Sequence, residues 1–345
     1  MSAASPFALA DPEWLAHRHV EDADAVRFLH VPRTDRSQVP FLTDANLGER
    51  VAAPDVPIAS CLDAAERPRT LCWLFHSAFC GSTLLAHALD MEGASSSLSE
   101  PVLLNDMVGA RRRGAPPAAV ARLADVALRL LARPYPGERA VVVKPSNIVN
   151  PLAELLLALA PQAPAVFLFA PLETFVLSVA RKGLPCRLWV RELLEGYLRD
   201  DFVALGLEPG EYFRLTDLQV AAVGWLAQHG HFQRLAAALP DGRLKLLDAD
   251  RMMADPAGAV TAVAVHYRLG VESSELARVA SGPAFARHSK SGGVYSAEAR
   301  RADYAAASAA YGDEIGVVLD WAHRVAEGAG IALAPPPALL LAHAG

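Results

Sequence analysis

The segment at residues 71–90, LCWLFHSAFCGSTLLAHALD, holds the residues best suited to bind an anion. An apolar run, a loop of small residues and a stretch with helical spacing predict a strand, a tight turn and a helix. Gly81 lets the backbone approach a ligand, and Ser82 and Thr83 place hydroxyl and backbone N–H groups at the start of the helix. Such a helix start attracts phosphate or sulfate. The alternative is an ordinary turn in which Ser82 caps the helix.

The same segment differs at two positions from the nucleotide-binding P-loop, GxxxxGK[ST]. Gly81 and Thr83 match the last glycine and the hydroxyl residue, but His76 stands at the first glycine and Ser82 at the lysine. That lysine supports the transferred phosphate, so its absence argues against ATP hydrolysis and phosphoryl transfer.

Lysine is rare in this chain, which gives the position of each lysine weight. Only four of the 32 basic residues are lysines, namely Lys144, Lys182, Lys245 and Lys290. Lys144 ends the apolar run 140–144 (AVVVK), and the carboxyl ends of parallel strands face the ligand crevice of an α/β sheet. We therefore expect Lys144 to face a ligand. The alternative is a side chain that extends to solvent from a strand end.

The composition restricts the class of protein. The chain has 345 residues, of which 52% are hydrophobic and 20% charged, with a net charge of −6, so disorder and a nucleic-acid-coating surface are excluded. The four cysteines form no CxxC pair and share no metal spacing with histidines, which predicts reduced thiols and no metal. The N-terminus has no signal-peptide pattern, and the most apolar stretch, 152–169, is interrupted by Glu154, Pro161 and Pro164. We expect a cytoplasmic protein that neither inserts into a membrane nor binds nucleic acid.

Beyond residue 70, short apolar runs alternate with segments of helical spacing. This alternation predicts an α/β fold, a parallel β-sheet sandwiched by helices with right-handed crossovers. The expected strands are 71–76, 140–144, 165–170 and 244–247, with a short one before Ser99. The expected helices are 83–90, 102–112, 118–131, 151–159, 172–181, 188–205, 215–239 and 257–269, with Ala-rich helices from 296 to 328.

The chain divides into three predicted regions. Residues 1–70 form an N-terminal extension that packs on the core, with a strand at 26–31 and a linker or edge loop at 55–68. Residues 71–295 form the main domain. Residues 296–345 form a C-terminal helical extension and tail.

The FCGSTLL loop resembles the P-loop of the sulfotransferases, which typically reads [RK]SG[ST]T before apolar residues. Three further segments agree with this family in order and spacing. Ser99-Glu100-Pro101 follows the P-loop helix after a short strand, and residues 167–181 (FLFAPLETFVLSVAR) resemble the strand and helix that carry the 3′-phosphate serine, here Ser178. Residues 244–270 are similar to the strand, turn and helix that close the family's domain. The resemblance covers residues 71–270 and extends to 295 at most.

This resemblance implies a P-loop NTPase-like, sulfotransferase-type sheet. It implies an enzyme that moves a sulfuryl group from 3′-phosphoadenosine 5′-phosphosulfate to a hydroxyl or amine of a small-molecule or carbohydrate acceptor, without a metal. The residues that it assigns to the donor are Cys80, Gly81, Ser82, Thr83, Leu84 and Ser178. It names neither the acceptor nor the oligomeric state.

Two cations that the family uses are missing. Phe79 and Cys80 replace the basic residue and the serine of the loop, and residues 170–173 (APLE) replace an Arg-Asp-Pro-Arg stretch. We expect Lys144, Arg181 and Lys182 to supply positive charge instead, although a basic helix end also satisfies the helix dipole. Lys290, in the basic segment 287–293, is either part of a lid over the donor or a surface residue.

Glu100 is the expected base for the acceptor proton. Pro101 favours an extended conformation at Glu100, and the alternative role is that of a carboxylate at a helix entry. His76 is a second candidate base, with the alternative that it bonds the loop backbone.

Two other functions stay open. One is a kinase-like P-loop phosphotransferase that uses Lys144 or Lys182 as a displaced lysine. The other is a catalytically degenerate P-loop binding protein.

Overall fold

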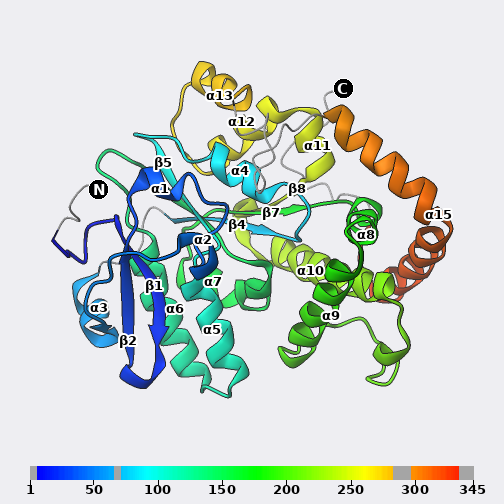
Figure 1. The fold of residues 1–345 in the computed structure, drawn as a ribbon, viewed down its shortest axis with the longest axis horizontal. Coiled ribbons are helices and arrows are strands. Elements are labelled where there is room, and N and C mark those ends of the chain that lie inside the picture. The colour runs from blue at the N-terminus through cyan, green and yellow to red at the C-terminus, as the bar shows by residue number, and fades with distance from the viewer. Residues whose placement is uncertain (1–5, 66–70, 283–296, 334–345) are drawn as a thin grey trace.

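A five-stranded parallel sheet forms the centre of the molecule. The computed structural model describes residues 6–65, 71–282 and 297–333 (Figure 1). The strand order is β5-β6-β4-β7-β8. The strands are β4 (Leu71–His76), β5 (Ser95–Ser99), β6 (Ala140–Lys144), β7 (Ala165–Phe169) and β8 (Leu244–Asp248). The expected α/β class with a helix-covered parallel sheet is confirmed.

The three central strands, β6, β4 and β7, are apolar except for the last residue of β4 and of β6, because helices cover both faces of the sheet. Every residue of β4, β6 and β7 is buried, as in sheets with no solvent face. The first strand of this sheet, β4, lies in its middle between β6 and β7, and the chain forms β5 and β6 on one side before it crosses to β7 and β8 on the other. At such a topological switch point, the crevice at the carboxyl ends of the strands binds ligands.

The helices follow the predicted alternation, with differences at their ends. The α-helices are α1 (Arg33–Arg36), α2 (Asp44–Leu47), α3 (Ile58–Ala64), α4 (Ser82–Ala88), α5 (Val102–Arg112), α6 (Pro117–Leu131), α7 (Ala153–Leu159), α8 (Leu172–Arg181), α9 (Gly183–Arg199), α10 (Asp217–Ala238), α11 (Ala249–Ala254), α12 (Pro256–His266), α13 (Ser273–Ala280) and α15 (Ala297–Gly328). Short 3₁₀ helices are η1 (Glu21–Ala23), η2 (Asn147–Leu152), η3 (Tyr212–Arg214) and η4 (Pro240–Gly242). The helix expected at 188–205 begins earlier, at Gly183, whose φ of 67° lies in the left-handed region. The Ala-rich helices expected after 296 are one helix, α15.

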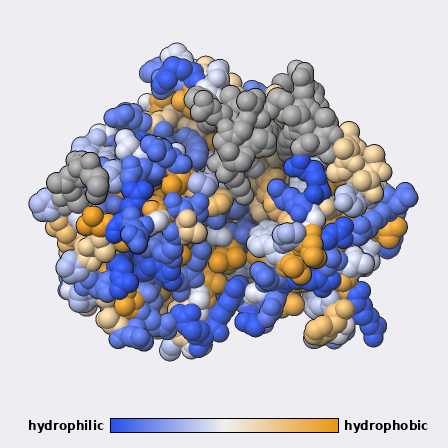
Figure 2. Space-filling model, viewed as in Figure 1, coloured by the Kyte–Doolittle hydropathy of each residue, from blue (hydrophilic) through white to orange (hydrophobic). Residues whose placement is uncertain are grey.

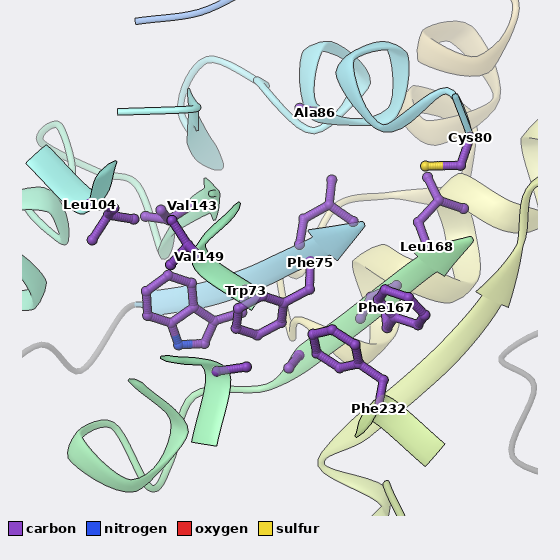
Figure 3. Packing of buried hydrophobic residues seen from close by; sticks show 14 of the residues in the cluster. Trp73, Phe75, Cys80, Ala86, Leu104, Val143, Val149, Phe167, Leu168 and Phe232 are labelled. Carbon is purple, nitrogen blue, oxygen red and sulfur yellow. The ribbon is translucent and has the colours of Figure 1, made fainter. Parts of the chain in front are cut away.

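Aromatic side chains fill the space between the sheet and α10. Phe167 on β7 stacks on Phe232 of α10 with ring centroids 4.0 Å apart, and Trp73 stacks on Phe75 at 5.4 Å (Figure 3). On the opposite face, the hydroxyl of Tyr267 donates to the Trp73 carbonyl (2.6 Å). The core therefore fixes β4, the strand that carries the anion-binding turn.

The N-terminal module, defined here as residues 6–65, is built on its own small sheet. Strands β1 (Trp14–Val20), β2 (Ala25–His30) and β3 (Val56–Pro57) pair antiparallel in that order. The prediction of a linker or edge loop at 55–68 was wrong for its described part, which contains β3 and α3. The short apolar stretch there is buried through Ile58 and Cys61, which the pattern of prolines and acids did not reveal.

The two appendages lie at opposite ends of the molecule (Figure 1). The N-terminal module packs on α5 and α6, and α15 packs on α8 and α10. On the face in Figure 2, hydrophilic residues dominate and hydrophobic ones form small separate groups. Within the described part of the chain, no helix combines the length and apolarity that a membrane crossing requires.

His229 is a buried histidine in the middle of α10. Its side chain is 1% exposed, and neither ring nitrogen has a partner among the described residues. The ring stacks on Trp225 with centroids 4.1 Å apart. Burial lowers the pKa of His229 from 6.5 to about 3.

This histidine makes the stability of the fold depend on pH. The unfolded chain binds the proton near pH 6.5 and the folded chain only near pH 3, so stability is full above 6.5 and falls as the pH decreases. We expect a loss of about 3 kcal/mol between pH 7 and pH 4.5, which His229→Phe removes. Urea unfolding at both pH values measures it, with His323→Phe on the exposed side of α15 as the control. An unchanged pH slope in His229→Phe would contradict the assignment.

Candidate functional site

Strained backbone is concentrated at the carboxyl edge of the parallel sheet. Apart from glycine and aspartate, the described residues with positive φ are Ala78 (71°), Phe79 (52°), Glu100 (51°) and Arg268 (56°). The first three closely follow β4 or β5. Left-handed backbone costs a non-glycine residue on the order of 1–2 kcal/mol, and such strain gathers at functional sites. This edge is therefore the candidate site.

Hydrogen bonds hold the loop after β4 in place. The Ala78 N–H donates to Nδ1 of His76 (3.1 Å), and Asn150 Nδ2 donates to the His76 carbonyl (3.0 Å). The Ser77 N–H donates to the Leu168 carbonyl on β7 (3.1 Å). His76 thus bonds the loop backbone, which was the alternative to its role as a base.

Gly81 occupies the point where the loop turns into α4. Its φ is 79°, it is exposed, and a Cβ atom there would lie 3.1 Å from Cε of Met252. The first N–H groups of a helix have no partner within the helix, and at this turn the Ser82 N–H donates to the sulfur of Cys80. The other residues assigned to the donor in this turn are buried, namely Cys80, Ser82, Thr83 and Leu84.

Cys80 is a buried thiol beside the charged part of the site. Burial raises its pKa, against the opposing effects of hydrogen bonds from Ser82 and of the positive charge of Lys144. The raised pKa favours the protonated, uncharged thiol.

Lys144 and Glu100 form an ion pair at the ends of β6 and β5. The Lys144 side chain is 0% exposed, and its Nζ lies 2.5 Å from Oε1 of Glu100, whose side chain is 16% exposed. The Glu100 N–H also donates to the Lys144 carbonyl (2.6 Å). Removing a charged group from water costs free energy that a close opposite charge offsets, so Glu100 compensates the buried ammonium of Lys144.

The expected extended conformation at Glu100 was wrong. Its φ of 51° lies in the left-handed region, in spite of the preference that Pro101 imposes. The hydrogen bond to the Lys144 carbonyl and the ion pair with its ammonium hold the residue there.

His76 lies beside this pair. Its Nε2 is 3.7 Å from Oε1 of Glu100, which is longer than a hydrogen bond. Since Nδ1 accepts the Ala78 N–H, the neutral ring carries its proton on Nε2, on the side of Glu100. The structure thus brings together all three residues expected to act in catalysis.

Ser178 lies on the other side of β4, and its hydroxyl is engaged. The residue is 3% exposed, its Oγ donates to the Thr174 carbonyl (2.8 Å), and it lies 3.0 Å from the hydroxyl of Tyr304 on α15. Tyr304 had no signal in the sequence, because it lies 126 residues further along the chain.

The side chain of Lys182 reaches the loop after β4. The ammonium of Lys182 lies 5.5 Å from the centre of the ring of Phe79, the position at which the resemblance predicts a basic residue. That ring also contacts Phe175 (5.6 Å) and Trp189 (5.5 Å). Arg181 is exposed at the end of α8, and Lys290 lies outside the described residues.

Buried polar atoms near the ion pair were missed by the sequence analysis. Ser99 precedes Glu100, pairs with Lys144 in the sheet, and its buried Oγ has no partner among the described residues. The same holds for Nδ2 of Asn147, which follows β6. Both are uncharged and common in loops, so their types gave no signal. No group of three or more His, Cys, Asp or Glu in the described chain is arranged to hold a metal ion.

No protein-family model matches the chain, and no curated protein matches it. Solved structures do resemble it. A sulfotransferase domain from the curacin biosynthetic pathway aligns with TM-score 0.41 and 15% identity, over 65% of this chain and 82% of that one. The sulfotransferase domain of the Synechococcus PCC 7002 olefin synthase gives 0.40 and 14%, over 64% and 81%. A sulfotransferase from Alicyclobacillus acidocaldarius gives 0.38 and 17%, over 60% and 83%. The likeness to these sulfotransferases concerns the fold.

Proposed function

We propose that the protein transfers a sulfuryl group from 3′-phosphoadenosine 5′-phosphosulfate to a hydroxyl or amine of a small-molecule or carbohydrate acceptor. The observation that carries this proposal is the buried Lys144–Glu100 ion pair at the edge of the sheet, beside the strained loop that ends at Gly81. A carboxylate and an ammonium at this place supply a base and a cation for group transfer.

The residues present fit the phosphosulfate end of the donor. Gly81 is exposed, has positive φ and leaves the space that a Cβ atom would fill, so the backbone can approach an anion. The ammonium of Lys182 lies over the Phe79 ring, so it supplies a positive charge at the loop in place of the missing basic residue. When bound, the donor supplies the sulfuryl group and a bisphosphate leaving group.

The fit at the 3′-phosphate is different. The Ser178 hydroxyl donates to the Thr174 carbonyl, so it would have to leave that bond to donate to a phosphate. The Tyr304 hydroxyl, 3.0 Å away, is a second donor for the same group. The proposed 3′-phosphate contacts are therefore Ser178 and Tyr304 together.

Glu100 and Lys144 are proposed to act in sequence. The proton of the acceptor hydroxyl passes to the carboxylate of Glu100, and the acceptor oxygen forms the new bond to sulfur as the phosphate oxygen leaves. Protonation removes the negative charge that balances Lys144, so the ammonium then attracts the negative charge that builds on the leaving phosphate. The pair thus shifts positive charge toward the leaving group at the moment of transfer.

Adenosine 3′,5′-bisphosphate, the product of the donor, should stabilise the protein. At one hundred times its dissociation constant, a ligand adds about 2.7 kcal/mol of apparent stability, which a thermal melt resolves. We expect this effect with the bisphosphate and not with ATP and Mg²⁺. Stabilisation by ATP and Mg²⁺ alone would favour the phosphotransferase alternative, and stabilisation by neither ligand would favour the degenerate one.

Lys182→Met should weaken bisphosphate binding by about tenfold, because one ammonium contact to an anion contributes about 1.5 kcal/mol. Isothermal titration calorimetry measures the change. Lys245→Met is the matched control, since Lys245 lies near the start of β8, at the end of the sheet opposite to the candidate site. If both variants changed the bisphosphate affinity equally, Lys182 would not be a contact of the bisphosphate.

Glu100→Gln should lower transfer by about 10²–10⁴-fold, the usual contribution of a general base. Transfer is measured with radioactive donor and a panel of phenols, amines and sugars, and bisphosphate binding should be retained. Glu92→Gln, an exposed glutamate before β5, is the control. Full transfer activity in the Glu100→Gln variant would show that Glu100 is not the base.

A further inference from the structure

An aromatic ring of the N-terminal module lies on the ammonium of Lys144. Nζ of Lys144 is 5.1 Å from the centre of the Phe41 ring, within the range of a cation–π contact. The same ammonium lies 2.5 Å from Oε1 of Glu100. Phe41 precedes β4 in the chain, so this contact joins the module to the candidate site from outside the parallel sheet.

The difference in burial shows what the ring does. Lys144 is fully buried, whereas Phe41 is partly exposed. The ring therefore forms part of the cover between the ammonium and solvent. The negative face of an aromatic ring attracts a cation, and this attraction strengthens where water is excluded. An aliphatic side chain would cover the ammonium without attracting it.

The backbone around Phe41 is fixed to the strand that carries Glu100. The N–H of Leu42 donates to the Ser99 carbonyl at the end of β5 (2.7 Å), and the Leu42 side chain is 2% exposed in the core. The position of the ring is thus set by a hydrogen bond one residue away and by the anchored side chain beside it.

The rest of the module is held to the main domain by charged contacts. Arg18 pairs with Asp106 of α5 (2.9 Å), and Arg33 pairs with Asp90 before β5 (2.8 Å). Nη2 of Arg133, after α6, donates to the Trp14 carbonyl (2.6 Å). These contacts make the module a rigid support for Phe41 rather than a loose cover.

We propose that Phe41 is a positioning residue for Lys144: its ring holds the ammonium against Glu100 and keeps water away from the pair. The use of that ammonium in transfer rests on the proposed function, but its placement does not. The experiment therefore measures the placement itself.

The chain offers two lysine–phenylalanine pairs that control for one another. In protein labelled with ¹³C at the lysine ε-carbon, the ring current of Phe41 should move the ε-methylene signal of Lys144 upfield, and that of Phe79 should move the signal of Lys182. With only four lysines, Lys144→Arg and Lys182→Arg assign both signals. We expect Phe41→Leu to move the Lys144 signal back downfield and to leave the Lys182 signal unchanged. We expect Phe79→Leu to move the Lys182 signal downfield and to leave the Lys144 signal unchanged. A Lys144 signal that stays in place in Phe41→Leu would overturn the proposal.

Chemical modification tests whether the ring also protects the ammonium. Reductive methylation of Lys144, followed by mass spectrometry, should be about tenfold faster or more in Phe41→Leu, because a desolvated cation–π contact is lost. Phe41→Tyr should restore the slow rate. Phe7→Leu, which changes a ring packed on Trp14 and Phe28 in the same module, should leave it slow.

These variants distinguish protection of Lys144 by the Phe41 ring from protection by the module as a whole. Equal acceleration in Phe41→Leu and Phe7→Leu would show that the module as a whole protects Lys144, and failure of Phe41→Tyr to restore protection would show that the aromatic face does not matter. Either result would overturn the proposal. Phe41→Met repeats the test with a flexible side chain if Phe41→Leu does not fold. Bisphosphate binding in the same variants reports on the proposed function separately.

Discussion

The ammonium of Lys144 must be neutralised inside the protein, and the geometry of the sheet edge follows from that requirement. A charge removed from water needs a partner close by, which places the Glu100 carboxylate against it. Glu100 reaches this position by taking up left-handed backbone after β5. The parallel pairing of Ser99 with Lys144 sets the two residues at the same level of the sheet. One buried charge thus accounts for a side-chain contact, a strained backbone and the register of an edge strand.

Two appendages enclose this edge from opposite sides. The N-terminal module contributes Phe41 on the side of β5 and β6, and α15 contributes Tyr304 on the side of β7 and α8 (Figure 1). The parallel sheet with its turn at Gly81 is an architecture that many proteins share. Segments outside that sheet complete the environment of the ion pair and of Ser178. Features that would adapt the site to one acceptor are therefore expected in the appendages.

The elements of the central sheet could be predicted because burial on both faces leaves a simple pattern. The runs at 71–76 and 140–144 are continuous apolar stretches, and they are strands with those bounds. The conformation of Glu100 could not be predicted, because the local preference set by Pro101 was overridden by a contact with Lys144, 44 residues away. The same reason applies to Phe41 and Tyr304. Their roles depend on long-range packing, which residue type and local spacing do not encode.

The buried ion pair also constrains how the chain can evolve. A change of Lys144 alone leaves a carboxylate facing a cavity, and a change of Glu100 alone leaves an ammonium in an apolar surrounding. Either single step lowers stability, whereas a joint exchange for two uncharged residues of similar volume does not. Positions 100 and 144 should therefore covary among descendants of this sequence. An aromatic residue at position 41 should persist only in lineages that keep the lysine.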